Sequence, residues 1–238
     1  MHVTIITALQ EELDAFRGAY SLSPVSESGP VPAFRFRYAA ADVTLLRSGV
    51  GKASAAMVAQ YAVDHFRPGY LVMTGICGGL DAGLALGDVV VSRTCVQHDL
   101  DVTALGFPLG QVPFTDHRFL EADPRLVELA LATPVPGQRV VAGRILTGDQ
   151  FITATDAARM KRLRSLHGSA VEMEGAAVAF VATVNRIPFV IIRSVSDHAD
   201  STAPDDFGAW LRRAAANSCT VCAGILHGLT GGPEHSAG

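Results

Sequence analysis

The chain has 238 residues, 49% hydrophobic and 18% charged, so it can bury a sizeable core and is too apolar to be disordered. A net charge of −4 argues against the basic surface that nucleic-acid binding requires, so a small molecule is the expected partner. The N-terminus lacks the basic region of a signal peptide, and no apolar run approaches the roughly 18 residues of a membrane span. Four scattered cysteines do not suggest a disulfide framework, and we expect a cytoplasmic protein.

Short runs of Val, Ile and Leu alternate with longer segments of helical period. The predicted strands are residues 3–6, 34–38, 43–48, 70–75, 89–92, 140–146, 170–171 and 189–195. The predicted helices are residues 11–19, 52–66, 125–132, 156–166, 175–185 and 207–229. Several strands are apolar throughout, which is typical of a sheet covered on both faces. The alternation predicts an α/β fold with a mainly parallel sheet, in one domain over 1–230, followed by a flexible tail at 231–238.

Four of the predicted strands run into polar or glycine-rich turns. These turns cover residues 7–12, 74–79, 172–175 and 193–197. Ligands of open α/β sheets bind beyond the carboxyl ends of the strands. If these strands lie side by side and parallel, Glu12, Glu174 and Asp197 converge on one pocket with a floor of glycine backbone.

Three other sequence patterns resemble functional motifs, but a structural explanation is favoured for each. Residues 49–52 (GVGK) resemble the end of a phosphate-binding loop, but the spacing is wrong, and a strand-to-helix turn is favoured. His98, Asp99 and Asp101 lack the distant ligand that a metal site needs, so we predict no metal. Cys219 and Cys222 lie within a helical apolar stripe, which indicates burial.

Seven motifs carry a resemblance when they are taken together and in order. They are residues 7–12 (TALQEE), 48–52 (SGVGK), 74–80 (TGICGGL), 98–103 (HDLDVT), 148–152 (GDQFI), 171–174 (VEME) and 193–197 (RSVSD). The set resembles the 5′-methylthioadenosine/S-adenosylhomocysteine nucleosidases of the purine nucleoside phosphorylase superfamily, from residue 1 to about residue 229. The resemblance implies a three-layer αβα fold with a mixed, partly barrel-like central sheet. It also implies a homodimer, no metal or organic cofactor, and a place in methionine salvage.

Cleavage of a nucleoside's N-glycosidic bond requires an acid at the purine, negative charge near the ribose and a base that holds water. Asp197 fits the acid, because a desolvated strand-end site would raise its pKa; a helix N-cap is the alternative. Glu174 fits the ribose hydroxyls, and it would also stabilise the first turn of helix 175–185. The resemblance assigns the attacking water to Glu12, whereas Glu11 is expected to face solvent.

Further site residues follow from the resemblance. Phe151 would stack on adenine and Ile152 would bind it through the backbone; Met173 and Arg193 would lie at the sugar, Ser196 would orient Asp197, and Glu172 and Gly78 would support the site. The 5′ pocket maps onto Leu9, Val50, Val102, Leu105, Phe107, Pro113 and Phe207, some of them contributed by a second subunit. Leu9, Val50 and Leu105 replace the usual methionine, isoleucine and phenylalanine, and Ile76 replaces a small polar residue.

The predicted reaction is hydrolysis of 5′-methylthioadenosine and S-adenosylhomocysteine with release of adenine. Phosphorolysis is disfavoured, because residues 10–12 offer no cation for a phosphate and Thr74 stands where related phosphorylases carry arginine. The altered 5′ pocket leaves an aminodeoxyfutalosine nucleosidase as a close alternative. A catalytically silent nucleoside-binding protein is a further alternative, and the presence of Glu12, Glu174 and Asp197 speaks against it.

Overall fold

The computed structural model describes residues 1–25, 29–153, 156–200 and 202–231, so the predicted tail beyond residue 231 lies outside the described residues. Its strands are β1 (His2–Thr7), β2 (Ser23–Pro24), β3 (Ala33–Tyr38), β4 (Ala41–Arg47), β5 (Tyr70–Gly79), β6 (Val89–Gln97), β7 (Leu120–Glu121), β8 (Val140–Thr147), β9 (Ala170–Glu172) and β10 (Phe189–Asp197). Its helices are α1 (Gln10–Ala19), α2 (Lys52–Phe66), the 3-10 turn η1 (Thr103–Leu105), α3 (Pro124–Leu131), α4 (Ala157–Ser165), α5 (Gly175–Val184) and α6 (Ala203–Thr230).

The strands form one sheet that is partly closed into a barrel. Their order is β10-β6-β8-β9-β5-β1-β4-β3-β2, with β7 beside β6. Because β10 also pairs with β5, the strands β10, β6, β8, β9 and β5 close a ring, and β1 to β4 extend from it as an open sheet. The mixed, partly barrel-like sheet implied by the resemblance is confirmed.

The prediction of a mainly parallel sheet from strand–helix alternation was wrong. Five strand pairings are parallel. Five others are antiparallel. The cause lies in short connections: β3 and β4 are joined by a tight turn, and no helix separates β5 from β6. A parallel return needs a long crossover, so these connections reverse the chain.

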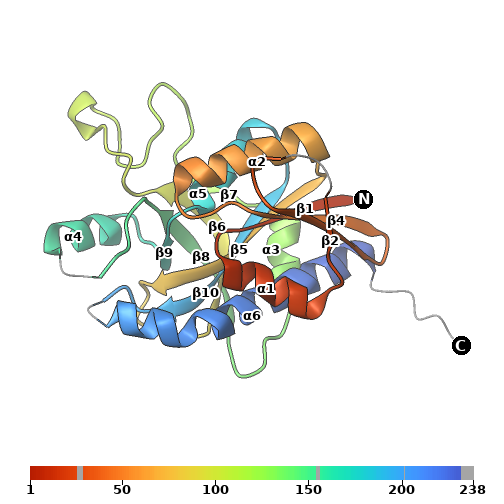
Figure 1. The fold of residues 1–238 in the computed structure, drawn as a ribbon. Coiled ribbons are helices and arrows are strands. Elements are labelled where there is room, and N and C mark those ends of the chain that lie inside the picture. The colour runs from red at the N-terminus through yellow and green to blue at the C-terminus, as the bar shows by residue number, and fades with distance from the viewer. Residues whose placement is uncertain (26–28, 154–155, 201, 232–238) are drawn as a thin grey trace, which may run out of the picture.

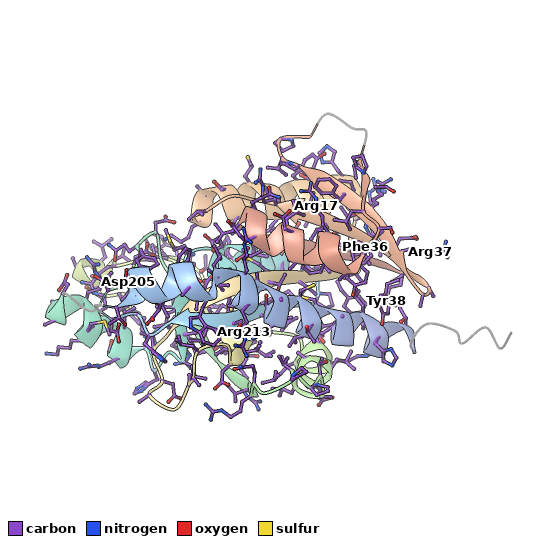
Figure 2. The ribbon with its side chains drawn as sticks, turned by 60° about the horizontal axis from the view of Figure 1, so that its bottom comes forward. Arg17, Phe36, Arg37, Tyr38, Asp205 and Arg213 are labelled. Atoms are coloured by element: carbon purple, nitrogen blue, oxygen red, sulfur yellow. The ribbon has the colours of Figure 1, made fainter. Side chains whose placement is uncertain are left out.

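Helices cover both faces of the sheet and complete the three layers (Figure 1). Helices α1 and α6 pack on each other, and α6 also packs on β5 and β10. Helices α2 and α5 pack together on the opposite face. The long helix α6 turns Ala214, Cys222 and Ile225 into the core. Asp205 and Arg213 lie on its exposed side (Figure 2).

Most predicted elements are confirmed, and the largest corrections concern strand lengths. Helix 52–66 is found with the predicted bounds, and α6 begins four residues earlier than expected, at Ala203. Both β5 and β10 continue through the motifs that we expected to be turns. The glycines of β5 make this possible: a Cβ on Gly75 would collide with the side chains of Glu12 and Arg193. The buried polar groups of the site therefore pack directly against strand backbone.

Two further findings concern membrane-spanning helices and disulfide bonds. Among the described residues, no helix is long and apolar enough to cross a membrane. All four cysteines are free and buried, including Cys219 and Cys222 in α6.

Candidate active site

One cavity of about 200 Å³ lies where α1, β5, β9 and β10 meet, next to the turn that precedes α2. It is lined by Ala8, Leu9, Glu12, Val50, Ile76, Cys77, Gly78, Gln150, Phe151, Ile152, Val171, Glu172, Met173, Glu174, Ser196, Asp197 and Phe207. Twelve of the predicted site residues are in this set. They come from seven separate parts of the sequence, so the convergence of Glu12, Glu174 and Asp197 is a property of the fold.

Glu12 lies in the first turn of α1, and only 2% of it is exposed. Its Oε2 accepts hydrogen bonds from the amides of Ala8 (2.7 Å) and Leu9 (2.9 Å), and its Oε1 accepts one from Ile76 (3.2 Å). The first two bonds cap the helix, so the side chain has a structural role as well. Burial raises the pKa of Glu12, although the charge of Arg193 and the three amides oppose the rise. Glu11 does not line the cavity, which agrees with its expected outward position.

Glu174 and Glu172 share the buried Arg193. The Nη2 of Arg193 donates to Oε2 of Glu172 and, at 3.4 Å, to Oε2 of Glu174. The other oxygen of Glu174 accepts from the amide of Gly51 at 2.8 Å. Burial raises the pKa of Glu174 to about 7 against the attraction of Arg193, and the nearby Glu172 adds to the rise. Arg193 lies beneath the cavity wall, and burial of its guanidinium is outweighed by the two carboxylates, which raise its pKa.

Glu172 has a largely structural set of partners. Its Oε2 accepts from the amides of Glu174 (3.0 Å) and Gly175 (2.7 Å), and its Oε1 accepts from the hydroxyl of Thr147. Negative charge at a helix N-terminus is favourable, and here it fixes the start of α5. The side chain therefore orients the backbone of Glu174, which fits the supporting role predicted for it.

Asp197 ends β10 and is 3% exposed. Its Oδ1 accepts from the amide of Ala199 (2.9 Å), and its Oδ2 lies 2.9 Å from the hydroxyl of Ser196. Burial raises the pKa of Asp197, and these two hydrogen bonds oppose the rise. Gly78 lies close behind: a Cβ there would be 2.9 Å from Oδ1 of Asp197. A buried carboxyl group with a raised pKa is suited to donating a proton.

The rest of the lining is largely apolar. Leu9, Val50, Phe151 and Phe207 all contribute, and the last two rings meet edge to face at 5.8 Å. No lysine or arginine belongs to the described residues that line the cavity. Sequence reasoning did not single out Ala8, Gln150 or Val171, which lie beside predicted residues in the chain.

Besides Arg193, four residues predicted at the substrate do not line the cavity of this chain: Val102, Leu105, Phe107 and Pro113. Val102 and Leu105 lie in and beside η1, and 69% of Leu105 is exposed. Phe107 lies on the same segment, in edge-to-face contact with Phe114. A contribution from these residues to a 5′ pocket requires a second subunit, and it remains a prediction.

The 49–52 turn and the residues Asp99 and Asp101, to which we assigned no function from the sequence, form contacts within the fold. The 49–52 turn connects β4 to α2, and the Lys52 ammonium binds the side chains of Asp99 (2.6 Å) and Gln97 (3.2 Å). Asp101 pairs with Arg162 at 3.1 Å. Within the part of the chain that the structure describes, no group of three His, Cys, Asp or Glu side chains could hold a metal ion.

Comparison with known proteins gives a consistent result. A family model described as the phosphorylase superfamily matches residues 2–227. A 5′-methylthioadenosine/S-adenosylhomocysteine nucleosidase of a Geobacillus species is 39% identical over 96% of this chain and 99% of its own length. The structure of such a nucleosidase from Neisseria meningitidis, in complex with methylthio-immucillin-A, superposes with a TM-score of 0.88 at 36% identity, covering 94% and 98% of the two chains. The futalosine hydrolase of Helicobacter pylori superposes with a TM-score of 0.87 at 28% identity, covering 95% and 97%.

The fold and the acidic cavity thus define a member of the phosphorylase superfamily. Within that superfamily, the chain belongs to the 5′-methylthioadenosine/S-adenosylhomocysteine nucleosidase family.

Proposed function

We propose that the protein hydrolyses the N-glycosidic bond of 5′-methylthioadenosine and S-adenosylhomocysteine, releasing adenine and the 5′-thio-substituted ribose. The observation that carries the proposal is the burial of Glu12, Glu174 and Asp197 around one cavity whose remaining walls are largely apolar. The nucleosidases to which the chain is similar supply the substrate class.

In the proposed mechanism, Asp197 donates its proton to the purine as the bond breaks and the electron pair moves into the base. The ribose then carries positive charge, which the carboxylate of Glu174 stabilises electrostatically at low cost in reorganisation. Glu12 holds the water that attacks the sugar carbon and accepts its proton. Ser196 and Gly78 support this by fixing the Asp197 carboxyl group.

Hydrolysis suits the cavity better than phosphorolysis. A phosphate dianion needs arginine side chains or several free amides. Here the amides of Ala8, Leu9 and Ile76 are already occupied by Glu12, and the guanidinium of Arg193 is bound to Glu172 and Glu174. A phosphate dianion beside these carboxylates would be repelled, whereas a neutral water molecule would not.

The lining favours the uncharged methylthio group at the 5′ position. The homocysteine group of S-adenosylhomocysteine also carries a carboxylate, so the apolar lining ranks methylthioadenosine alone ahead of a carboxylate-bearing substrate such as aminodeoxyfutalosine. Leu9, Val50 and Phe207 offer apolar contacts, and the described lining holds no cation for a carboxylate. Burial of an unpaired charge is costly. An aminodeoxyfutalosine nucleosidase, which must accept a benzoate tail, is therefore the second candidate. The structural similarity to the futalosine hydrolase of Helicobacter pylori supports it as an alternative.

A substrate panel tests the proposal. Purified protein is incubated with methylthioadenosine, adenosylhomocysteine and aminodeoxyfutalosine, each with and without phosphate, and free adenine is measured. We expect adenine from the first two substrates at a rate independent of phosphate. Ribose 1-phosphate among the products would overturn hydrolysis, and intact nucleosides after long incubation would indicate a binding protein.

We further propose a homodimer that acts in the cytoplasm, in methionine salvage. Exposed apolar side chains support the dimer. Met57 lies on α2 and Val50 just before it, and Val184 ends α5. Leu105 and Phe114 lie in the connection between β6 and β7. His117 contacts Phe180 of α5, so this connection lies against the same face of the sheet as α2 and α5 (Figure 1). Several exposed apolar side chains on one side of a protein are typical of an interface. A partner subunit could bring Val102 and Leu105 to the cavity.

A further inference from the structure

The 49–52 turn supplies one of the two contacts that hold Glu174. The amide of Gly51 donates to Oε1 of Glu174 at 2.8 Å, and Arg193 binds the other oxygen. Gly51 precedes the first residue of α2 and has φ +97°, a backbone conformation that residues other than glycine rarely adopt. A Cβ there would also be 3.2 Å from Oδ1 of Asp149. The position of this amide thus depends on how the turn is anchored.

Lys52 anchors the turn in a closed set of contacts with two aspartates. Its ammonium binds Oδ1 of Asp99 at 2.6 Å, and its amide binds Oδ1 of Asp149 at 2.8 Å. The amide of Asp149 binds the second oxygen of Asp99 at 2.9 Å, which completes the circuit. The Lys52 and Asp99 side chains are 19% and 20% exposed, so solvent screens their charges only partly.

The two aspartates are brought together by the sheet. Strands β6 and β8 are parallel neighbours, with Gln97 opposite Thr147 at their ends. Asp99 and Asp149 each follow two residues beyond these ends. Although burial opposes it, hydrogen bonds from Lys52 and from the Asp149 amide lower the pKa of Asp99, so this carboxylate remains ionised.

The same circuit anchors a second part of the cavity. Asp149 leads directly into Gln150, Phe151 and Ile152, all of which line the cavity. Lys52 itself does not line the cavity, so any effect on the reaction must act through these neighbours. One ammonium group therefore fixes both the amide that binds Glu174 and the segment that is expected to face the purine.

We propose that Lys52 is a positioning residue for the nucleosidase reaction, which orients Glu174 and the 149–152 segment through its ion pair with Asp99. The inference rests on the proposed function, because it assigns Glu174 to the ribose. It predicts that loss of the ammonium affects both substrate binding and the ionisation of Glu174.

The test compares Lys52→Met, Asp99→Asn and the double variant with wild type, using methylthioadenosine. Misplacement of a substrate-orienting group costs up to about 100-fold, so we expect kcat/KM to fall roughly 10- to 100-fold in Lys52→Met, with KM raised. Because the two residues act as one unit, the double variant should lose no more than the worse single variant. Arg162→Met, which breaks the ion pair with Asp101 instead, is the matched control and should stay within about twofold of wild type.

The pH dependence separates positioning from general destabilisation. Glu174 faces Arg193 on β10, Glu172 on β9 and Glu12 on α1, and none of these is altered by the substitutions. Loss of the Gly51 hydrogen bond should raise the pKa of Glu174 further and move the acid limb of the kcat/KM profile to higher pH. Unchanged kinetics and pH profile in folded Lys52→Met, or additive losses in the double variant, would overturn the inference.

Folding and function are controlled separately. Circular dichroism and thermal melting report whether each variant folds, and Asp99→Asn, which keeps the shape of the side chain, decides the outcome if Lys52→Met does not fold. Asp99→Asn with the wild-type pH profile would then overturn the inference. Failure of wild type to release adenine would refute the proposed function, whereas active wild type with indifferent variants would refute only the role of Lys52.

Discussion

The hydroxyl of Ser196 lies 2.9 Å from Oδ2 of Asp197 and 3.2 Å from the carbonyl oxygen of Cys77. A hydroxyl has one proton, so it can donate to only one of these oxygens at a time. When it donates to the carbonyl oxygen of Cys77, its own oxygen can accept a hydrogen bond from the protonated carboxyl group of Asp197. The protonated acid that departure of adenine requires is therefore compatible with the buried surroundings of β10.

Asp197→Asn removes this acid while it preserves the size of the side chain. We expect kcat to fall by roughly 10²- to 10⁴-fold, the usual contribution of a positioned acid, with the fold intact. Steady-state adenine release and a thermal melt measure the two effects. Asp14→Asn, an exposed aspartate on α1, is the control. Near-normal turnover by Asp197→Asn would refute the assignment of the acid.

Gly78→Ala tests the packing behind the same carboxyl group. The added Cβ would be 2.9 Å from Oδ1 of Asp197 and 3.0 Å from Cβ of Ala199, so the carboxyl group must move. We expect at least a tenfold loss of kcat, in line with the sensitivity of catalysis to small displacements. Gly18→Ala, where the new Cβ would meet nothing within 4 Å, should keep its activity. Equal kinetics for the two variants would show that Gly78 is dispensable.

Glu12→Gln removes the proposed acceptor for the proton of water. The amide keeps one oxygen for the Ala8 and Leu9 hydrogen bonds, so the helix start should survive, whereas hydrolysis should fall by roughly 10²-fold or more. Glu11→Gln, one residue earlier and outside the cavity lining, is the matched control. Single-turnover adenine release compares the pair. A similar small loss in both variants would contradict the role of Glu12.

Glu174 links the site to stability. Its pKa is raised from 4.5 to about 7 by burial, so the folded protein binds this proton more tightly than the unfolded chain. The resulting stabilisation is fully present below pH 4.5 and is lost as the pH rises through about 7. The Tm of Glu174→Gln should therefore improve relative to wild type between pH 5 and pH 8, by roughly a few degrees. The exposed Glu128→Gln variant should show a constant difference; a constant difference for Glu174→Gln as well would refute the raised pKa.

Met57→Asp tests the proposed dimer. Met57 is 48% exposed on α2, and a charge within an apolar interface is costly to bury. We expect wild type to sediment as a dimer and the variant as a monomer with weakened catalysis, because Val102 and Leu105 would no longer reach the cavity. The exposed Arg213→Asp variant on α6, on the other face of the sheet, should remain dimeric (Figure 2). Monomeric wild type with full activity would contradict this proposal.

The sequence predicted which residues gather at the cavity better than it predicted the sheet that holds them. The resemblance singled out Glu12, and helical spacing added only that its neighbour Glu11 should point in a different direction. The sequence could not show that β5 and β10 continue through their polar motifs. The glycines that permit this in β5 are indistinguishable from turn glycines when only the sequence is known. Closure of the barrel through the β5–β10 pairing depends on contacts between residues more than a hundred positions apart. Val102 and Leu105 could be assigned only by resemblance, because no local signal indicates a second subunit.

The central claim is that Glu12, Glu174 and Asp197 surround a single sugar–base linkage. The most direct test is a crystal structure of the protein with a non-hydrolysable methylthioadenosine analogue. We predict N7 of the purine within hydrogen-bonding distance of Asp197, the ribose hydroxyls at Glu174, and a water molecule between Glu12 and the sugar. A ligand bound elsewhere, or one in this cavity with its purine away from Asp197, would contradict the account.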